Sequence, residues 1–135
     1  MTDRQRYFFG KEDKLKSRKQ IDRLFSKGKH FSNFPFKVIW LPENEKGILQ
    51  AGVGVSSRYF KKAVDRNRIK RLMREGYRLQ KNVLYDHLQA TGRKISVFIL
   101  YTGRELPDYE TVFERMGAIL KRLKKFSDEN TETAD

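Results

Sequence analysis

The sequence lacks cysteine altogether, holds only two histidines and has no long apolar run. The absence of cysteine excludes disulfides, a cysteine-ligated zinc site and a thiol nucleophile, and it removes any direct sign of the redox compartment. No stretch approaches the roughly 18–20 apolar residues that span a bilayer, and residues 1–10 are too polar for a secretory signal. We therefore expect a cytoplasmic protein.

Residue sets typical of catalytic or metal centres are missing as well. No acidic cluster has the spacing of a metal site, and no H-x-x-x-H pair or Ser/His/Asp set stands out. His30 and His87 are isolated in the sequence, which is typical of surface or structural histidines. The run Gly52-Val53-Gly54 lies in a strand pattern and lacks the G-K-[ST] of a phosphate loop, so it predicts a close approach of backbones. We assign no catalytic residue and no metal ligand.

Acidic residues are scarce relative to basic ones. Thirty Lys and Arg face 17 Asp and Glu, and because residues 127–135 hold four acids and no base, residues 1–126 carry a net charge of +17. Such a charge points to a polyanionic partner, either nucleic acid or an anionic membrane surface. The aromatic content of 13% provides rings for a core and for stacking on bases, which favours RNA or single strands.

The length of 135 residues corresponds to a single domain. We assign residues 1–126 to that domain and expect residues 1–14 to be loose. Residues 127–135 are acidic and polar, so we predict a disordered tail there.

Hydrophobic periodicity predicts an α+β fold. Ser17 and Gln20 have capping-box spacing at the start of a helix that ends at Gly28. Residues 36–41 and 50–57 predict two strands that pair as a hairpin, and residues 95–101 predict a central strand covered on both faces. A helix over residues 63–82 and a last helix capped by Asp108 complete an αββαβα two-layer sandwich on a small mixed sheet.

The helix over residues 63–82 carries the strongest functional signal. Ile69, Leu72, Met73, Gly76 and Tyr77 form its apolar stripe, while arginines and lysines occupy the other side. Ten bases face only two acids between positions 58 and 81. A solvated helix surface would need more acids at i±4 to relieve this repulsion, so the pattern favours binding to a phosphate backbone.

Residues 63–72, Ala-Val-Asp-Arg-Asn-Arg-Ile-Lys-Arg-Leu, closely resemble the RNR signature of the bacterial ribonuclease P protein subunit. The resemblance extends upstream through residues 52–56 and the bases before the helix, and then to Lys14, Ile21 and Gly28, so that residues 14–126 fall in the expected order. It implies the same sandwich, with a left-handed βαβ crossover where the default hand is right.

The resemblance also implies a function. In this family a large RNA hydrolyses the phosphodiester with magnesium ions, and the protein binds that catalytic RNA and the 5′ leader of pre-tRNA to assist leader removal. The chain would thus be an accessory subunit of an endoribonuclease, with magnesium held mainly by the RNA. Neither DNA nor a membrane is expected as a partner.

Carried over by position, the contacts to the catalytic RNA fall on Arg58, Lys61, Lys62, Arg66, Asn67, Arg68, Lys70, Arg71 and Arg74. The leader cleft, between the first helix and the sheet, falls on Ile21, Phe25, Phe36 and Ile39. Stacking on a ring tolerates any base, which suits leaders of varied sequence. Ordinary core packing is the alternative for Phe25 and Phe36, since a helical stripe at i, i+3, i+4 is usually core.

Three rival functions use the same features. A ribosomal or RNA-chaperone module would also need a basic helix on a sheet, and only the RNR segment separates it from the ribonuclease P interpretation. A membrane-surface protein would need the apolar face of the helix, which the sheet requires for its core. A protein-only nuclease would cleave with magnesium in the absence of any RNA subunit.

Overall fold

The computed structural model describes residues 14–15, 18–43 and 48–133. The expectation of a loose segment over residues 1–13 and the capping role of Ser17 fall outside the described residues. Lys14, which was expected to belong to the loose segment, forms a parallel bridge with Ala51, and the N–H of Leu15 donates to the Ala51 carbonyl at 3.0 Å.

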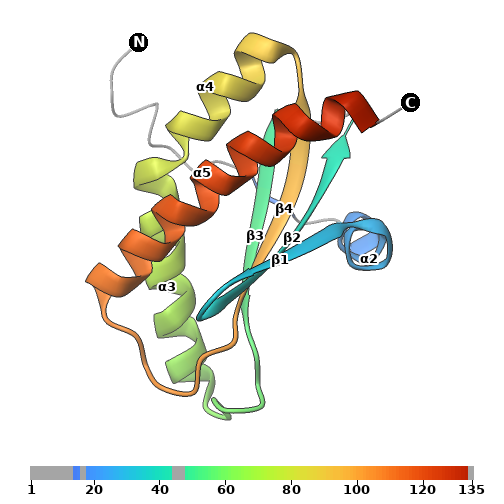
Figure 1. The fold of residues 1–135 in the computed structure, drawn as a ribbon. Helices are drawn as coiled ribbons and strands as arrows, with labels where there is room; N and C mark the ends of the chain where they lie inside the picture. The colour runs from blue at the N-terminus through green and yellow to red at the C-terminus, as the bar shows by residue number, and fades with distance from the viewer. Residues whose placement is uncertain (1–13, 16–17, 44–47, 134–135) are drawn as a thin grey trace.

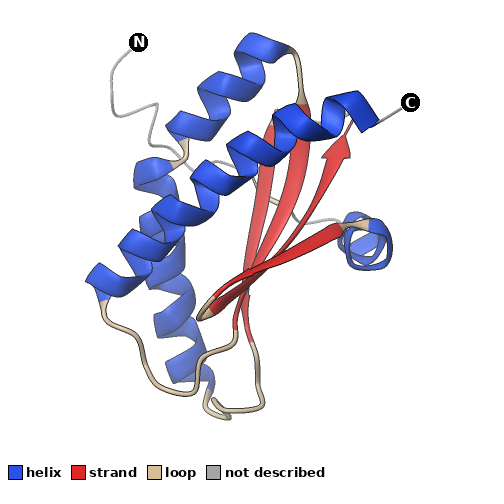
Figure 2. Ribbon diagram, viewed as in Figure 1, coloured by secondary structure: helices blue, strands red, loops and turns tan. Residues whose placement is uncertain are grey.

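The described elements confirm the α+β class (Figures 1 and 2). In chain order they are α2 (Arg18–Lys27), β1 (Lys29–Asn33), β2 (Phe36–Glu43), β3 (Leu49–Val55), α3 (Ala63–Gln80), α4 (Asn82–Thr91), β4 (Lys94–Tyr101) and α5 (Tyr109–Thr133). Two of them, β1 and α4, were not predicted from the sequence. The helices α3, α4 and α5 lie on one side of the sheet, and α2 lies on the other (Figure 1).

The strand order is β1-β2-β4-β3, with antiparallel pairs except for the parallel pair β3 and β4. The predicted hairpin between residues 36–41 and 50–57 is therefore wrong. The apolar strand β4 lies between β2 and β3 and pairs with both, which separates the two strands expected to be neighbours. The hairpin in the structure joins β1 to β2 through a turn at Phe34-Pro35, whose peptide bond is cis.

The predicted central strand is confirmed as β4. Its residues alternate between two faces, with Ile95, Val97, Ile99 and Tyr101 in the larger core cluster. Because β3 and β4 run parallel, α3 and α4 together form the crossover connection between them. The left hand of this crossover stays a prediction.

Two clusters of buried side chains hold the layers together. The larger cluster fills the space between the sheet and the helices α3, α4 and α5. The smaller cluster joins Leu15, Leu24 and Ile39 beneath α2, with Ile21 and Phe98 packed against it. The sheet is therefore covered fully on one side and in part on the other.

The helix α2 ends where the sequence predicted. Its last residue is Lys27, and the N–H of Gly28 donates to the Leu24 carbonyl at 2.8 Å. Two side-chain contacts tie α2 to the sheet: Arg23 pairs with Glu43, and the Gln20 amide donates to the Gln50 side-chain oxygen at 3.0 Å.

The helix predicted over residues 63–82 is divided in two. α3 ends at Gln80, and α4 runs from Asn82 to Thr91 and is capped by Gly92, which has the left-handed φ of 72°. Leu84 and Leu88 of α4 are fully buried in the larger cluster. The sequence after residue 82 thus adds a second helix to the crossover.

The start of α5 confirms Asp108 as its cap. The backbone N–H of Thr111 donates to Asp108 Oδ1 at 2.7 Å, and this bond lowers the pKa of the Asp108 carboxyl. The helix continues to Thr133, so the prediction of a disordered tail is wrong for residues 127–133. Ser127 is buried, and Asp128 Oδ1 lies 2.7 Å from His87 Nε2 and accepts from Arg93 at 2.5 Å, which lowers the Asp128 pKa.

Two glycines in different surroundings predict opposite effects of the same substitution. A Cβ at Gly28 would lie 2.4 Å from the Leu24 carbonyl oxygen and 2.8 Å from Ile39 Cγ2, whereas a Cβ at Gly76 would meet ordinary contacts at 3.6 Å and beyond. We expect Gly28→Ala to lower the free energy of unfolding by about 1–3 kcal/mol through overpacking. Gly76→Ala should raise the free energy of unfolding by up to about 1 kcal/mol, because glycine in a helix interior is less stable than alanine. Urea denaturation of the two variants measures both, and equal destabilisation would contradict the packing described here.

Candidate nucleic-acid interface

The helix α3 presents two chemically different faces. Ile69, Met73, Gly76 and Tyr77 are buried against the sheet and α5. Helical geometry then turns the remaining residues outward. We define the α3 surface as the exposed polar residues of α3 and of the segment before it: Arg58, Lys61, Lys62, Asn67, Arg68, Arg71 and Arg74. All of them were predicted as RNA contacts.

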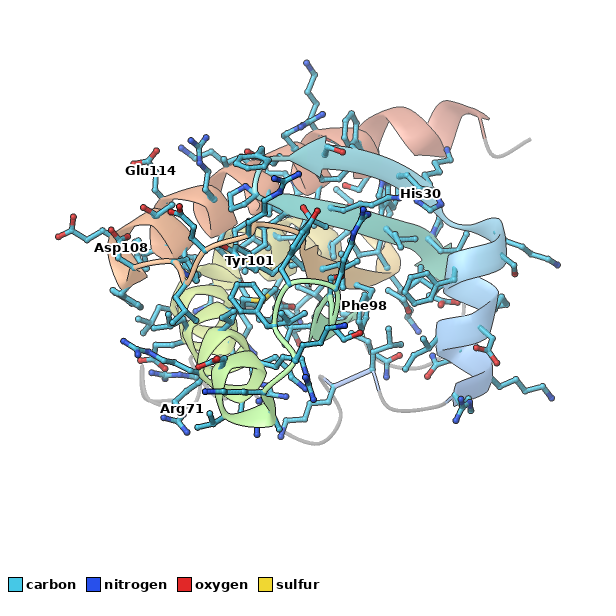
Figure 3. All side chains as sticks on the ribbon, turned by 90° about the horizontal axis from the view of Figure 1, so that it is seen from below. His30, Arg71, Phe98, Tyr101, Asp108 and Glu114 are labelled. Atoms are coloured by element: carbon cyan, nitrogen blue, oxygen red, sulfur yellow. The ribbon has the colours of Figure 1, made fainter. Side chains whose placement is uncertain are left out.

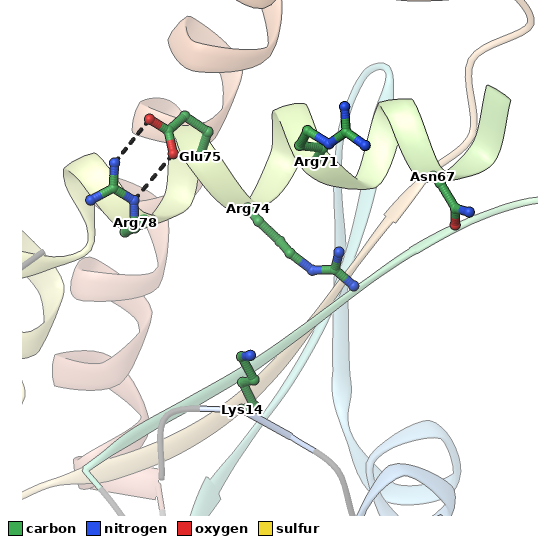
Figure 4. Close-up of a pocket in the computed structure, with 6 residues that line it drawn as sticks. All are labelled: Lys14, Asn67, Arg71, Arg74, Glu75 and Arg78. Carbon is green, nitrogen blue, oxygen red and sulfur yellow. Dashed lines mark hydrogen bonds and ion pairs between the residues drawn. The ribbon is translucent and has the colours of Figure 1, made fainter. Parts of the chain in front are cut away.

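Part of this surface is hollowed into an open pocket of about 470 Å³. Its lining consists of Lys14, Asn67, Arg71, Arg74, Glu75 and Arg78 (Figure 4). Five residues of this basic pocket lie on α3, and Lys14 joins them through its bridge to β3. No pattern in the sequence places Lys14 beside the helix, since 53 positions separate it from Asn67.

The acid in the basic pocket has a defined role. Arg78 donates two hydrogen bonds to Glu75, of 3.1 and 2.9 Å, and this contact raises the pKa of the Arg78 guanidinium. Glu75 therefore orients Arg78 and balances its charge (Figure 4). The positive charge at the pocket then comes from Lys14, Arg71 and Arg74, which suits a phosphate group.

Arg66 and Lys70 differ from the other predicted RNA contacts because both are half-buried. One terminal nitrogen of Arg66 donates to two carbonyls, of Phe60 at 2.8 Å and of Lys61 at 2.7 Å. The side chain thus holds the segment that enters α3. Arg66 therefore contributes to the α3 surface indirectly, because it positions the segment that carries Lys61 and Lys62.

Tyr59 and Arg104 were missed by the sequence reasoning. The guanidinium carbons of Arg58 and Arg104 lie over the Tyr59 ring, 5.5 and 5.2 Å from its centre. These contacts join the loop before α3 to the loop after β4. An isolated arginine 46 positions beyond Arg58 gives no sequence signal for such a contact.

A second surface lies where α2 meets the sheet. The rings of Phe25 and Phe98 lie 5.3 Å apart between their centres, and we call them the ring pair. Phe25 is 43% exposed, which excludes the core alternative for this residue. Phe98 lies on the side of the sheet toward α2, whereas Arg71 lies on the outer side of α3 (Figure 3).

Gly52 and Gly54 make room for the Phe98 ring. A Cβ would lie 3.0 Å from Phe98 Cδ1 at Gly52 and 2.8 Å from Phe98 Cζ at Gly54. The neighbour of this glycine pair is therefore a side-chain ring, and not the second backbone that the sequence predicted. Phe98 itself was missed as a site residue, although alternation along β4 places it opposite Val97 and Ile99.

The remaining predicted cleft residues are core residues. Phe36 is 1% exposed and belongs to the larger cluster, on the face of the sheet away from α2, so its assignment to the leader cleft is wrong. Ile39 faces α2 but is 2% exposed beneath it, which makes it inaccessible to RNA. Ile21 is half-buried and packs against the same smaller cluster.

Within the described ranges, no group of three or more His, Asp or Glu side chains is placed to hold a metal ion. In the same ranges no helix is long and apolar enough to cross a membrane. A sheet that seats a helix with an arginine-rich outer face, beside an exposed pair of aromatic rings, defines the class of a nucleic-acid-binding domain.

Comparison with known proteins narrows this class to one family. The family model for ribonuclease P matches residues 9–124. The ribonuclease P protein component of Porphyromonas gingivalis is 34% identical over 91% of both chains, and that of Clostridium botulinum is 33% identical over 85% of this chain and 95% of the relative. The chain belongs to the ribonuclease P protein family.

Solved structures agree with the fold. The ribonuclease P protein of Thermotoga maritima has a TM-score of 0.65 at 27% identity and covers 81% of this chain and 96% of its own. The Staphylococcus aureus protein, at 22% identity, has a TM-score of 0.69 over 84% of this chain and 97% of its own. The chain is thus the protein component of an endoribonuclease ribonucleoprotein that works with an RNA subunit in tRNA 5′ processing.

The contacts of Arg66 predict that two neighbouring arginines of the RNR segment act differently. Arg66→Ala should lower the free energy of unfolding by roughly 1–2 kcal/mol, since it removes charge-assisted bonds to two carbonyls. Arg68→Ala should change it by less than about 0.5 kcal/mol, because the side chain is exposed. Chemical denaturation compares the two variants, and the same stability for both would contradict the structural role of Arg66.

Proposed function

We propose that the α3 surface and the basic pocket bind the phosphate backbone of the catalytic RNA, and that the ring pair binds the 5′ leader of pre-tRNA. The protein then holds both RNAs, and the catalytic RNA hydrolyses the phosphodiester bond. No residue of this chain takes part in the bond-breaking step.

The observation that carries the first part is the seating of α3. Its apolar stripe is buried in the core, which fixes the position of the helix. The arginines that the helix carries therefore lie across the basic pocket from Lys14. Guanidinium groups stay protonated at every relevant pH and bind phosphate oxygens in pairs. A preorganised row of such groups suits one segment of a folded RNA, whose phosphates are also held in place.

The leader part rests on the ring pair and its surroundings. Phe25 is exposed beside Phe98, and glycine backbones lie under the Phe98 ring. A single strand has unpaired bases that stack on such rings with little dependence on sequence. Mature tRNA has no leader, so this surface supplies a reason for the protein to favour pre-tRNA.

We also propose that the magnesium ions of the reaction are held mainly by the catalytic RNA. The acids of the described residues near the α3 surface are Asp65 and Glu75, and Glu75 is paired with Arg78. The contribution of the protein near the RNA is therefore positive charge. That charge offsets phosphate repulsion and lowers the concentration of magnesium that the complex requires.

Reconstitution tests the proposed function directly. The purified protein is added to a bacterial ribonuclease P RNA at low magnesium, and 5′ maturation of pre-tRNA is followed by gel. We expect the protein to restore cleavage at a magnesium concentration at which the RNA alone is inactive. Cleavage by the protein without RNA, or no effect on the RNA, would contradict the proposal.

Phe25 tests the leader surface. Phe25→Ala should weaken binding of pre-tRNA to the assembled enzyme by roughly 1–3 kcal/mol, while binding of mature tRNA is unchanged. The matched control is Phe34→Ala, which removes a ring that is 75% exposed in the β1–β2 turn and lies outside both surfaces. Fluorescence titration with the two tRNA forms measures this discrimination, and a Phe25→Ala variant that retains it would refute the role of the ring pair.

A further inference from the structure

A second group of cations lies on α5, away from the α3 surface. Positions 121–125 hold four cations around Leu123. Lys121, Lys124 and Lys125 are exposed, and we call them the α5 lysines. We infer that the α5 lysines form a further binding site for RNA phosphates, separate from the α3 surface and the ring pair.

The fourth cation of this group, Arg122, has a structural role. Its guanidinium lies 4.3 Å from the centre of the Phe31 ring and 5.5 Å from that of Phe126, and it donates to the Ser32 carbonyl at 2.8 Å. These contacts fasten α5 to β1. The α5 lysines make no such contacts among the described residues, so packing does not explain them.

Helix electrostatics does not explain the α5 lysines either. Cations favour the last turn of a helix, where the carbonyl ends carry partial negative charge. α5 continues to Thr133, more than two turns beyond Lys125. Within the part of the chain that the structure describes, the nearby acid Asp128 is engaged by His87 and Arg93.

The position of the α5 lysines makes them a separate site. The first half of α5 packs on α3 through Phe113 and Met116 and carries the exposed acids Glu110 and Glu114. Glu114 and Asp108 lie at the end of the molecule where α5 begins (Figure 3). The α5 lysines lie beyond these acids, where Arg122 and Phe126 pack on β1 and β2.

The partner that fits this site is RNA. Val112, Met116, Ile119, Leu120 and Leu123 of α5 are buried in the core, so the helix has no apolar face to insert into a lipid bilayer. Charge without apolar surface suits a phosphate backbone. This inference rests on the proposed function only in that the partner is RNA, and the site serves either a peripheral strand of the catalytic RNA or the body of pre-tRNA.

The test compares two variants of equal net charge. Lys121→Gln with Lys125→Gln removes two α5 lysines, and Lys19→Gln with Arg115→Gln removes two exposed cations outside every proposed surface. Each variant is titrated, over a salt series, with the catalytic RNA and, after assembly, with pre-tRNA. For one of the two RNAs, we expect the α5 variant to have an affinity roughly tenfold lower than the wild type. The slope of its log affinity against log salt concentration should be smaller by about two, and the control variant should change neither quantity.

The outcomes separate this inference from the proposed function. If the salt slope of the α5 variant is reduced with only one of the two RNAs, that RNA is the one that the α5 lysines bind. If the α5 variant matches the wild type with both RNAs while Arg71→Gln with Arg74→Gln loses slope, the inference is wrong and the proposed function stands. If the α5 variant instead loses binding only to vesicles of anionic lipid, the partner is a membrane and the inference is overturned.

Discussion

The apolar stripe of α3 is the contact on which the rest of the molecule depends. Ile69, Met73 and Tyr77 have no exposed surface, and they fix the helix against both β3 and α5. Because these side chains are buried in the core, the arginines between them lie on the opposite face of the helix and point toward solvent. The same residues therefore stabilise the domain and position its charge, and a change in the core would move the arginines of the α3 surface as well.

The two faces of the sheet are covered to different extents. The larger cluster on the helical side is continuous, which holds α3 in place on the sheet. On the other side α2 covers only part of the sheet, and the ring pair lies at the boundary of that cover. A partly covered sheet costs some burial of apolar surface, and in return it leaves aromatic rings at a fixed position in contact with solvent.

Local sequence patterns were sufficient to predict several helix features. The apolar stripe of α3, the cap at Asp108 and the stop at Gly28 each depend on residues within one or two turns, and the structure confirms them. Pairing partners depend on distant residues, so the position of β4 between β2 and β3 was not predictable from spacing. Phe36 was misplaced because it was assigned to the same cleft as Ile39. The two residues lie three positions apart in β2, and alternation along a strand places them on opposite faces.

The strand order has a consequence for the time course of synthesis. β4 is one of the two inner strands of the described sheet and also the last of its strands to be synthesised. Before residues 94–101 emerge, β3 has no neighbour among the described strands except at the Lys14 bridge, and α3 has no completed sheet to pack on. The apolar stripe of the arginine-rich helix therefore has no complete core to enter until β4 and α5 have been made. The charged surface of the domain takes its final arrangement only after nearly the whole chain has been made.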